Sequence, residues 1–360
     1  MPESHVTVDP ADWVCPLPLR ETKRIVLGHG GGGVLSEELI ENLFLPAFGS
    51  MVGAGRDSAL LDVPAGRIAM TTDSYVVQPL FFPGGNIGDL AVNGTINDLA
   101  CSGAQPIGLT AAFILEEGLQ LEVLAAVAQT MGKAASNAGV AIVTGDTKVV
   151  GKGSADQLFV NTAGVGVVPP GVDIGPEKAR PGDRIIVSGN LGEHGVAIMS
   201  AREGMDFGTV VTTDSAPMHR LVAAMLAACA ASGAPDAVHA LRDPTRGGLI
   251  ASVVEIARTA QVGVELDEAE IPVPETVSSA CSFLGLDPLQ VANEGKLVAF
   301  VEPSHSDAVL AAMRGQPEGA NAAVIGRVVA EHPGMAVAKT PFGTTRVIDR
   351  ELGEQLPRIC

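Results

Sequence analysis

Basic residues are scarce in this sequence, which has 23 Lys and Arg against 41 Asp and Glu and a net charge of −18 at pH 7. Proteins that bind nucleic acid need basic patches for the phosphates, and anionic membrane surfaces attract the same positive charge. The composition therefore argues against a nucleic acid or a membrane surface as a partner. It is compatible with metal ions, for which carboxylates are good ligands.

Cysteine is also infrequent, and no two of the five cysteines form a C-x-x-C pair. The odd number and wide spacing argue against a disulfide framework or a zinc site, so a reducing compartment is expected. Cys101, Cys229 and Cys281 stand in apolar stretches and are expected to be small core residues. Cys15 has no evident role, and Cys360 is the last residue of the chain.

Long apolar runs are missing as well. No stretch approaches the roughly 18 apolar residues that a membrane-spanning helix needs. The first 12 residues are polar and acidic, without the apolar core of a signal peptide. We therefore expect a cytoplasmic protein.

Small apolar residues are abundant instead, since hydrophobic residues make up 46% of the chain but aromatic residues only 3%. A length of 360 residues predicts about two domains. Strands alternate with helices in both halves, which indicates an α/β fold. We expect an irregular extension at residues 1–26, domains at residues 27–170 and 171–340, and a flexible tail at residues 341–360.

Two segments of the first half carry polar residues in apolar surroundings. The pattern predicts a helix over residues 87–102, in which Asn93 and Asn97 share one face and either bind a metal or form a solvated surface. It also predicts a strand over residues 140–144 that ends just before Asp146 and Lys148. Ligands are often bound at the ends of buried strands in α/β sheets.

A glycine-rich loop at residues 28–33 precedes a helix that is expected to begin near Ser36. Such loops can surround phosphates with bare backbone N–H groups. The loop lacks the Gly-Lys-Ser/Thr of a Walker A motif. A flexible linker is an equally good interpretation.

Acidic residues recur at strand ends or beside glycines. The set comprises Asp73, Asp98, Asp146, Asp243 and Glu294, together with Lys148. Carboxylates that bridge Mg²⁺ to phosphates, with a lysine to balance phosphate charge, are typical of a nucleotide site. Any one of these acids alone is more often a turn or N-cap residue.

The chain ends in the sequence PRIC, with Cys360 at the terminus. Chain ends are usually loose, so a flexible tail is expected. Its thiol either carries a group into a pocket or is an incidental cysteine on a frayed end.

Several strings together resemble one family. They are TTDS at 71–74, FFPGGNIG at 81–88, GTINDLA at 94–100, TGDTKVV at 144–150, DPTRGG at 243–248, ANEGK at 292–296 and the terminal PRIC. They resemble the HypE family of hydrogenase maturation proteins, which belongs to the superfamily of aminoimidazole ribonucleotide synthetase and selenophosphate synthetase. The resemblance covers nearly everything from residue 26 onwards.

The resemblance implies a two-domain, PurM-like α/β fold in which the N-terminal domains of a homodimer pair their sheets into a barrel, with ATP near the cleft. A HypF-type carbamoyltransferase would load a carbamoyl group onto Cys360. The protein would then use ATP to dehydrate the S-carboxamide to an S-thiocyanate. A HypC–HypD complex would receive the cyano group on iron for [NiFe]-hydrogenase.

The resemblance also implies roles for single residues. Cys360, Glu294 and Lys148 would be catalytic. ATP would be bound by Asp73, Asp98, Asp146, Lys148, Gly31 and Gly32. Mg²⁺ would be held by Asp73, Asp98, Asp146 and Asp243. Two alternatives remain open at this point: another ATP-dependent enzyme of the same superfamily that acts on a free small molecule, or a non-catalytic thiol carrier.

Overall fold

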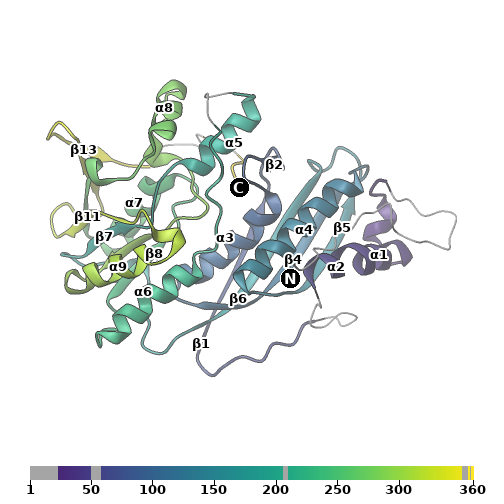
Figure 1. Ribbon diagram of the computed structural model, residues 1–360, viewed down its shortest axis with the longest axis horizontal. Coiled ribbons are helices and arrows are strands. Elements are labelled where there is room, and N and C mark those ends of the chain that lie inside the picture. The colour runs from purple at the N-terminus through teal and green to yellow at the C-terminus, as the bar shows by residue number, and fades with distance from the viewer. Residues whose placement is uncertain (1–22, 50–57, 206–209, 351–355, 357) are drawn as a thin grey trace.

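The computed structural model describes residues 23–49, 58–205, 210–350, 356 and 358–360. Two α/β domains lie side by side along the long axis of the molecule (Figure 1). The expected extension at residues 1–26, with Cys15, lies almost wholly outside the described residues. Within the described ranges, no helix has the length and apolar character needed to cross a bilayer.

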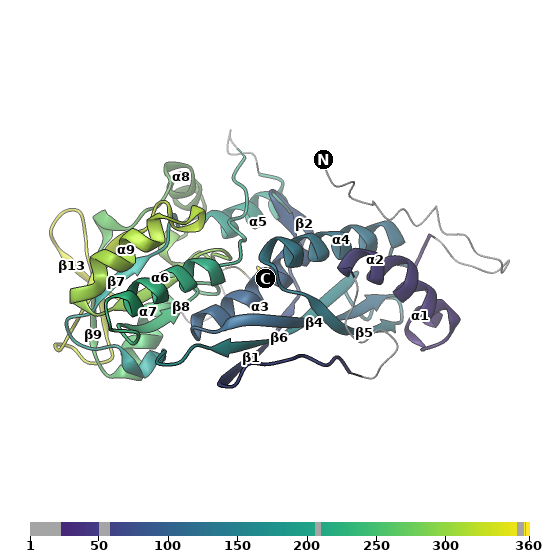
Figure 2. The same cartoon turned by 60° about the horizontal axis from the view of Figure 1, so that its bottom comes forward.

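The first domain is built on a four-stranded sheet with the order β1–β6–β4–β5. The strands are β1 (Arg67–Tyr75), β4 (Gln105–Glu116), β5 (Ile142–Val150) and β6 (Leu158–Val168). β4 and β5 pair in parallel, whereas β6 pairs antiparallel with β1 and β4. Helices α3 (Ile87–Cys101) and α4 (Leu121–Ala138) lie on one face, and no described helix covers the opposite face (Figure 2).

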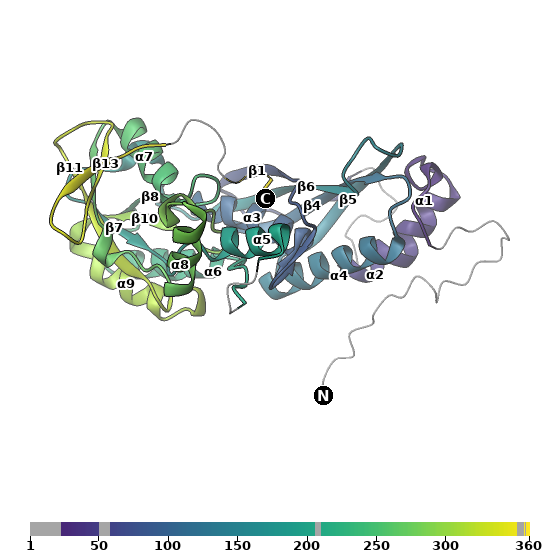
Figure 3. The ribbon, with the colours of Figure 1, turned by 90° about the horizontal axis from the view of Figure 1, so that it is seen from above.

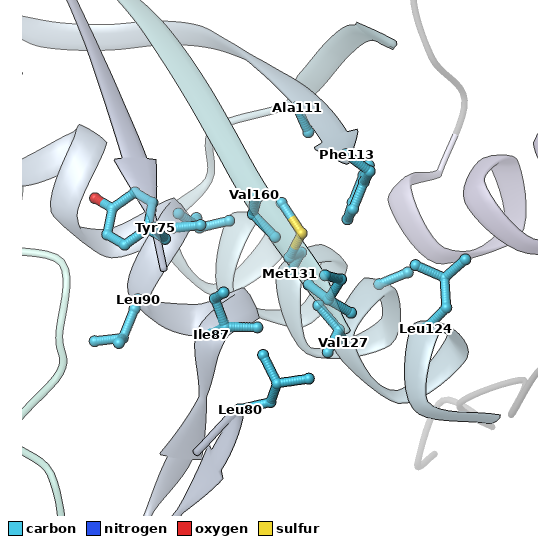
Figure 4. Close-up of a cluster of buried hydrophobic side chains, with 14 of the residues drawn as sticks. Tyr75, Leu80, Ile87, Leu90, Ala111, Phe113, Leu124, Val127, Met131 and Val160 are labelled. Atoms are coloured by element: carbon cyan, nitrogen blue, oxygen red, sulfur yellow. The ribbon is translucent and has the colours of Figure 1, made fainter. Parts of the chain in front are cut away.

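The core of this domain lies between the sheet and the two helices. Apolar residues of α4 recur every three or four positions, so that Leu124, Val127 and Met131 point towards the sheet (Figure 4). α3 is buried nearly all round, because it lies between the sheet and the second domain. Asn93 and Asn97 are therefore buried, and the expectation of a solvated face is wrong.

Short elements complete the first domain. They are α1 (Val34–Leu39), a π-helical turn (Ile40–Phe44), α2 (Leu45–Phe48), β2 (Phe81–Phe82) and β3 (Gly85–Asn86). The glycine loop forms a 3₁₀ turn, Leu27–Gly30, just before α1. Ser36 ties this loop to the helix, since its hydroxyl accepts from the Gly32 N–H and donates to the His29 carbonyl.

The second domain has a seven-stranded sheet with the order β13–β12–β9–β11–β7–β10–β8. Its strands are β7 (Arg184–Val187), β8 (Val238–Arg242), β9 (Gly263–Asp267), β10 (Val298–Val301), β11 (Ala323–Val329), β12 (Ala336–Lys339) and β13 (Thr345–Ile348). Its helices are α5 (Glu193–Glu203), α6 (His219–Ala231), α7 (Gly248–Ala260), α8 (Glu275–Leu284) and α9 (Ser306–Arg314). Successive strand residues point to opposite faces, so one core forms with α7 and another with α6 and α9.

Two sequence expectations need correction. The tail is not free from residue 341, because β13 pairs antiparallel with β12 and buries Ile348. The run Thr-Arg-Val-Ile is rich in β-branched residues and follows a short turn, which suits a hairpin strand. Strand β5 does not end at residue 144, because parallel pairing with the long strand β4 carries it on to Val150. Asp146 and Lys148 therefore lie within the strand.

Candidate active site

A cavity of about 280 Å³ at the junction of the two domains contains five of the residues singled out by sequence. Its walls include Asp73, Asp98, Asp243, Glu294 and Cys360. The C-terminus lies between the domains, close to α3 and α5 (Figure 3). Residues far apart in the chain thus converge on one site.

Each acid is placed by a different element. Asp73 lies on β1 and Asp98 on α3, where the Thr71 hydroxyl donates to Asp98 Oδ2 at 2.8 Å. Asp243 directly follows β8, and Glu294 precedes β10. Both domains therefore contribute carboxylates, and the cavity depends on how the domains pack.

Buried amides hold the domains in this arrangement. The Asn97 side chain donates to the carbonyls of Ala216 and Glu294, at 3.0 and 3.1 Å, and accepts from the Met218 N–H at 2.7 Å. Asn93 donates to the Ser215 hydroxyl at 3.0 Å. Both amides thus link α3 to the second domain, while the buried Asn93 Oδ1 has no hydrogen-bond partner among the described residues.

Glu294 is the most confined acid of the cavity, with a residue exposure of 3%. Its backbone N–H donates to Asp214 Oδ1 at 3.0 Å, which fixes the loop. Gly295 passes so close to the Asp214 carbonyl that a Cβ at this position would overlap it. The side-chain Oε1 of Glu294 is buried and has no hydrogen-bond partner among the described residues, so one oxygen is left for a ligand.

Three carboxyl groups of the cavity, those of Asp98, Asp243 and Glu294, have raised pKa values. Burial, followed by the charges of Asp243 and Asp214, raises the pKa of Glu294 well above its usual range. Burial and the neighbouring Asp98 raise the pKa of Asp243 to about 6. Carboxylates that face one another without a compensating cation behave in this way. The cavity therefore favours protons or a bound cation.

Sequence reasoning missed the basic and hydroxyl residues of the same cavity. Arg242, Thr245 and Arg246 line it alongside the acids. Thr245 and Arg246 belong to the string DPTRGG, so a signal for them was present. Arg242 also pairs with Glu255 at 3.0 Å, which directs part of its charge away from the cavity.

The tail reaches this cavity within its own chain. The Val76 N–H donates to the Cys360 carbonyl at 3.1 Å, and the Gln78 N–H donates to the Arg358 carbonyl at 3.3 Å. Ile359 is 2% exposed and packs into the core of the first domain. Residues 358–360 are thus docked rather than loose, and the Cys360 side chain stays partly accessible.

The glycine loop and β5 enclose a second cavity of about 240 Å³. Gly30, Gly32, Asp146 and Lys148 line it, whereas Gly31 does not. Three stacked phenylalanines, Phe44, Phe48 and Phe113, form its apolar part. Lys148 bonds to Asp146 at 2.7 Å and lowers the pKa of that carboxyl.

The structure therefore divides the predicted nucleotide set in two. The register relates Ser74 on β1 to Asn161, Ala112 and then Asp146 on β5. Three strand spacings of about 4.8 Å place Asp146 roughly 14 Å from β1. Asp73 also points to the opposite face from Ser74, because neighbouring strand residues alternate. Within one chain, Asp146 and Lys148 do not meet Asp73, Asp98 and Asp243.

The donor chemistry of the first cavity suits Mg²⁺. Asp73, Asp98 and Asp243 offer hard oxygen ligands, and their crowding would be relieved by a cation. Among the described residues, no three His, Cys, Asp or Glu side chains converge closely enough to hold a metal alone. Mg²⁺ commonly uses one or two carboxylates plus phosphates and water, which fits this looser arrangement.

Comparison with known proteins identifies both domains. Residues 55–168 match the N-terminal domain of AIR synthase related proteins, and residues 180–338 match the C-terminal domain. The carbamoyl dehydratase HypE of Rhizobium leguminosarum bv. viciae is 54% identical over 338 residues, which cover 94% of this chain and 95% of the relative.

Solved structures agree with this match. A crystal structure of the hydrogenase maturation protein HypE in complex with ATP is similar with a TM-score of 0.87 and 46% identity, covering 93% of this chain and 99% of that chain. A HypE–HypF complex is similar with a TM-score of 0.76 and 44% identity, covering 89% and 100%. The resemblance and the two-domain fold inferred from sequence are confirmed: this chain belongs to the HypE family of carbamoyl dehydratases, within the AIR synthase related proteins.

Proposed function

We propose that this protein dehydrates a carbamoyl group carried by its own Cys360 to a thiocyanate, at the expense of ATP. The observation that supports this most directly is the position of the terminal cysteine. Cys360 lines the same cavity as Glu294, Asp73, Asp98 and Asp243. A group attached to its sulfur therefore lies beside a buried base and a set of carboxylates.

ATP and Mg²⁺ complete the proposed site. Binding of ATP is proposed because a HypE structure that is 46% identical contains it. Asp73, Asp98 and Asp243 would hold Mg²⁺, which would neutralise phosphate charge when bound. Lys148 and Asp146, with Gly32 of the loop beside them, would act on the nucleotide from the second cavity.

The proposed chemistry replaces a poor leaving group by a good one. The carboxamide oxygen attacks the γ-phosphorus of ATP, the bond to ADP breaks, and one N–H proton is lost, which leaves an imidate phosphate. Loss of the second N–H proton then forms the C≡N triple bond as the C–O bond breaks and phosphate departs. The atoms of one water thus leave the carbamoyl group and appear in phosphate and released protons.

Glu294 is the proposed base for these protons. Its burial raises the carboxyl pKa, so that its ionised form is a stronger proton acceptor than an exposed carboxylate. The unpartnered Oε1 gives it an atom with which to contact the carboxamide N–H. Cys360 lies on the same cavity wall, so no long movement of the substrate is needed.

A homodimer is proposed from the uncovered face of the first sheet. Ile68, Met70 and Ile114 are exposed there, with Met70 reaching 76%. Asp146 and Lys148 lie on strand β5 of the same sheet and are exposed as well. A second copy would bury the apolar residues, as the barrel pairing implied by the family requires.

Two further partners follow from the proposed reaction. A HypF-type carbamoyltransferase would supply the carbamoyl group, and a HypE–HypF complex is known for a relative that is 44% identical. A HypC–HypD complex would accept the cyano group on iron, for the metal centre of [NiFe]-hydrogenase. Both exchanges require Cys360 to leave the cavity.

The test is the intact mass of the C-terminal peptide after incubation with carbamoyltransferase, carbamoyl phosphate and ATP. Carbamoylation should raise the mass of the peptide by that of HNCO, without ATP turnover by this protein. When this protein then uses ATP, the mass should fall by that of one water. Cys360→Ser serves as the control and should show neither change. A carbamoylated tail that never loses water would leave only a thiol carrier, and the proposal would fail.

A further inference from the structure

The last three residues occupy a site assembled from both domains. They run alongside residues 76–78 of the first domain in the opposite direction, with backbone hydrogen bonds to Val76 and Gln78. The second domain contacts them through α5, which carries His194 and Arg202. The contacts made by these elements fall mainly on backbone atoms of the tail.

His194 is a buried member of this site. Its Nε2 lies 2.9 Å from the Ile359 carbonyl oxygen, and its Nδ1 lies 2.8 Å from the Thr213 hydroxyl. A carbonyl can only accept, so Nε2 carries the proton and Nδ1 accepts from Thr213. The ring of Phe82 meets the imidazole edge-on at 5.7 Å. Both ring nitrogens and the ring orientation are therefore determined.

Arg202 connects the tail to the strand beside it. Its Nη2 donates to the Gln78 carbonyl at 2.7 Å and to the Arg358 carbonyl at 2.9 Å. One guanidinium thus bridges the two antiparallel segments. Charged donors form stronger hydrogen bonds than neutral ones, so this bridge contributes substantially to holding the tail.

The tail contributes two side-chain anchors of its own. Arg358 pairs with Asp156 at 2.6 Å and donates to the Val76 carbonyl at 2.9 Å. It does so with φ of +55°, a left-handed conformation that costs a non-glycine residue roughly 1 kcal/mol. Ile359 fills a buried position beside Leu356 and Cys360. These contacts offset the backbone strain and turn the terminus towards the cavity.

We propose that residues 76–78, His194 and Arg202 form a binding site for the C-terminal segment that recognises its backbone, with His194 as the positioning residue that holds Cys360 over the acidic cavity. Such a site would hold the terminus in the same place before and after Cys360 is modified. Contacts to backbone carbonyls do not involve the sulfur, so they persist whether Cys360 is unmodified, carbamoylated or a thiocyanate. The proposal deepens the proposed function, but its test needs neither ATP nor a carbamoyl group.

The experiment measures the fraction of molecules in which the tail is undocked from the site. A carboxypeptidase needs several free residues at the terminus, so it trims only the undocked tail, and its rate follows the undocked fraction. The full-length protein is digested under native conditions, and intact mass reports the loss of Cys360 and Ile359. His194→Leu removes the donor at Nε2, whereas His194→Gln retains an N–H donor at a similar position.

One lost hydrogen bond changes an equilibrium by about two- to tenfold, so His194→Leu should speed trimming by this factor. His194→Gln should restore most of the protection, which a merely structural role would not predict. His219→Leu is the matched control, because this half-buried histidine of α6 makes no hydrogen bond to the described residues of the tail. It should trim at the wild-type rate.

Unchanged trimming in His194→Leu, with an unchanged thermal midpoint, would overturn the proposal. If His194→Leu lowers the thermal midpoint, the Arg202→Met variant is tested instead. It removes the hydrogen bond to the Arg358 carbonyl, and Arg202 is less buried than His194, so the fold should be less disturbed. Faster trimming of Arg202→Met supports the site, and wild-type trimming overturns it. The dehydration test follows the mass of Cys360 in the wild-type protein, and the trimming of these variants does not enter into it. Failure of the docking proposal is therefore distinct from failure of the proposed function.

Discussion

The cavity at the domain junction and the cavity at the glycine loop contain the same residue type in opposite electrostatic states. In the cavity at the domain junction, burial and neighbouring acids raise the pKa values of Glu294 and Asp243. At the glycine loop, Lys148 lowers the pKa of Asp146, and both side chains are more than half exposed. The two cavities contain the same carboxyl group, so residue type alone does not set the direction of its pKa shift. Burial and neighbouring charges, which the fold supplies, set it.

The difference suggests that the two cavities have different chemical roles. A buried carboxyl group with a raised pKa is a stronger base in its ionised form than an exposed one, which suits the removal of protons from a carboxamide. An exposed carboxylate paired with lysine stays ionised and suits an interaction with Mg²⁺, while the lysine suits an interaction with phosphate. Substitutions in the two cavities should therefore differ in which property they change.

The largest effect is expected for Glu294→Gln. The substitution keeps the size of the side chain but removes its basicity, and a general base contributes about 10²- to 10⁴-fold to a rate. Dehydration of the carbamoylated tail, followed by mass, should slow by about this factor while carbamoylation of Cys360 continues. A rate within threefold of wild type would assign the proton transfer to another group.

A smaller effect, on stability, is expected for Asp243→Asn. The pKa of this carboxyl is about 6 in the folded protein and about 3.9 when unfolded. Between these pH values the folded state retains a proton that the unfolded state has lost, so the free energy of unfolding falls as pH rises through the window.

The asparagine variant should lack this fall. At pH 7 it should be more stable than wild type by less than about 3 kcal/mol, because two pKa units set the upper limit and the side chain is only partly buried. Thermal unfolding midpoints at pH 4 and pH 7 measure the change. Parallel pH profiles for both proteins would contradict it.

The smallest stability effect is expected for Lys148→Ala. The pair with Asp146 is exposed on both sides, and such pairs contribute about 0–1 kcal/mol. The unfolding midpoint should therefore barely move, whereas ATP-dependent dehydration should decline if Lys148 balances phosphate charge. A large drop in the unfolding midpoint would contradict this prediction, because it would show that Lys148 is needed for stability rather than for phosphate charge.

Much of the fold could be read from local pattern. The helix predicted over residues 87–102 forms as α3, Ile87–Cys101, and the predicted alternation of strands and helices in both halves is confirmed. Strand β13 was not expected, because its residues lie in the segment that was predicted to be a flexible tail. The extent of β5 was misjudged because pairing with β4, a long-range interaction, overrides the local signal of Gly145 and Asp146.

The candidate site was predictable in its composition but not in its grouping. Asp73, Asp98, Asp243, Glu294 and Cys360 were each marked by a motif, and the structure brings all five into one cavity. Asp146 and Lys148 were marked by the same reasoning but belong to another cavity. His194 and Arg202 had no motif that related them to the tail, because their role depends on backbone atoms more than 150 residues away.

Local chemistry therefore identified the family, the terminal cysteine and the acids, because residue type and neighbouring residues suffice to define a motif. Packing of the two domains determined the rest. It set which acids share a cavity, which carboxyl groups have raised pKa values, and whether the terminus is loose or docked. These properties arise from burial and from contacts between segments distant in the chain, which no local pattern contains.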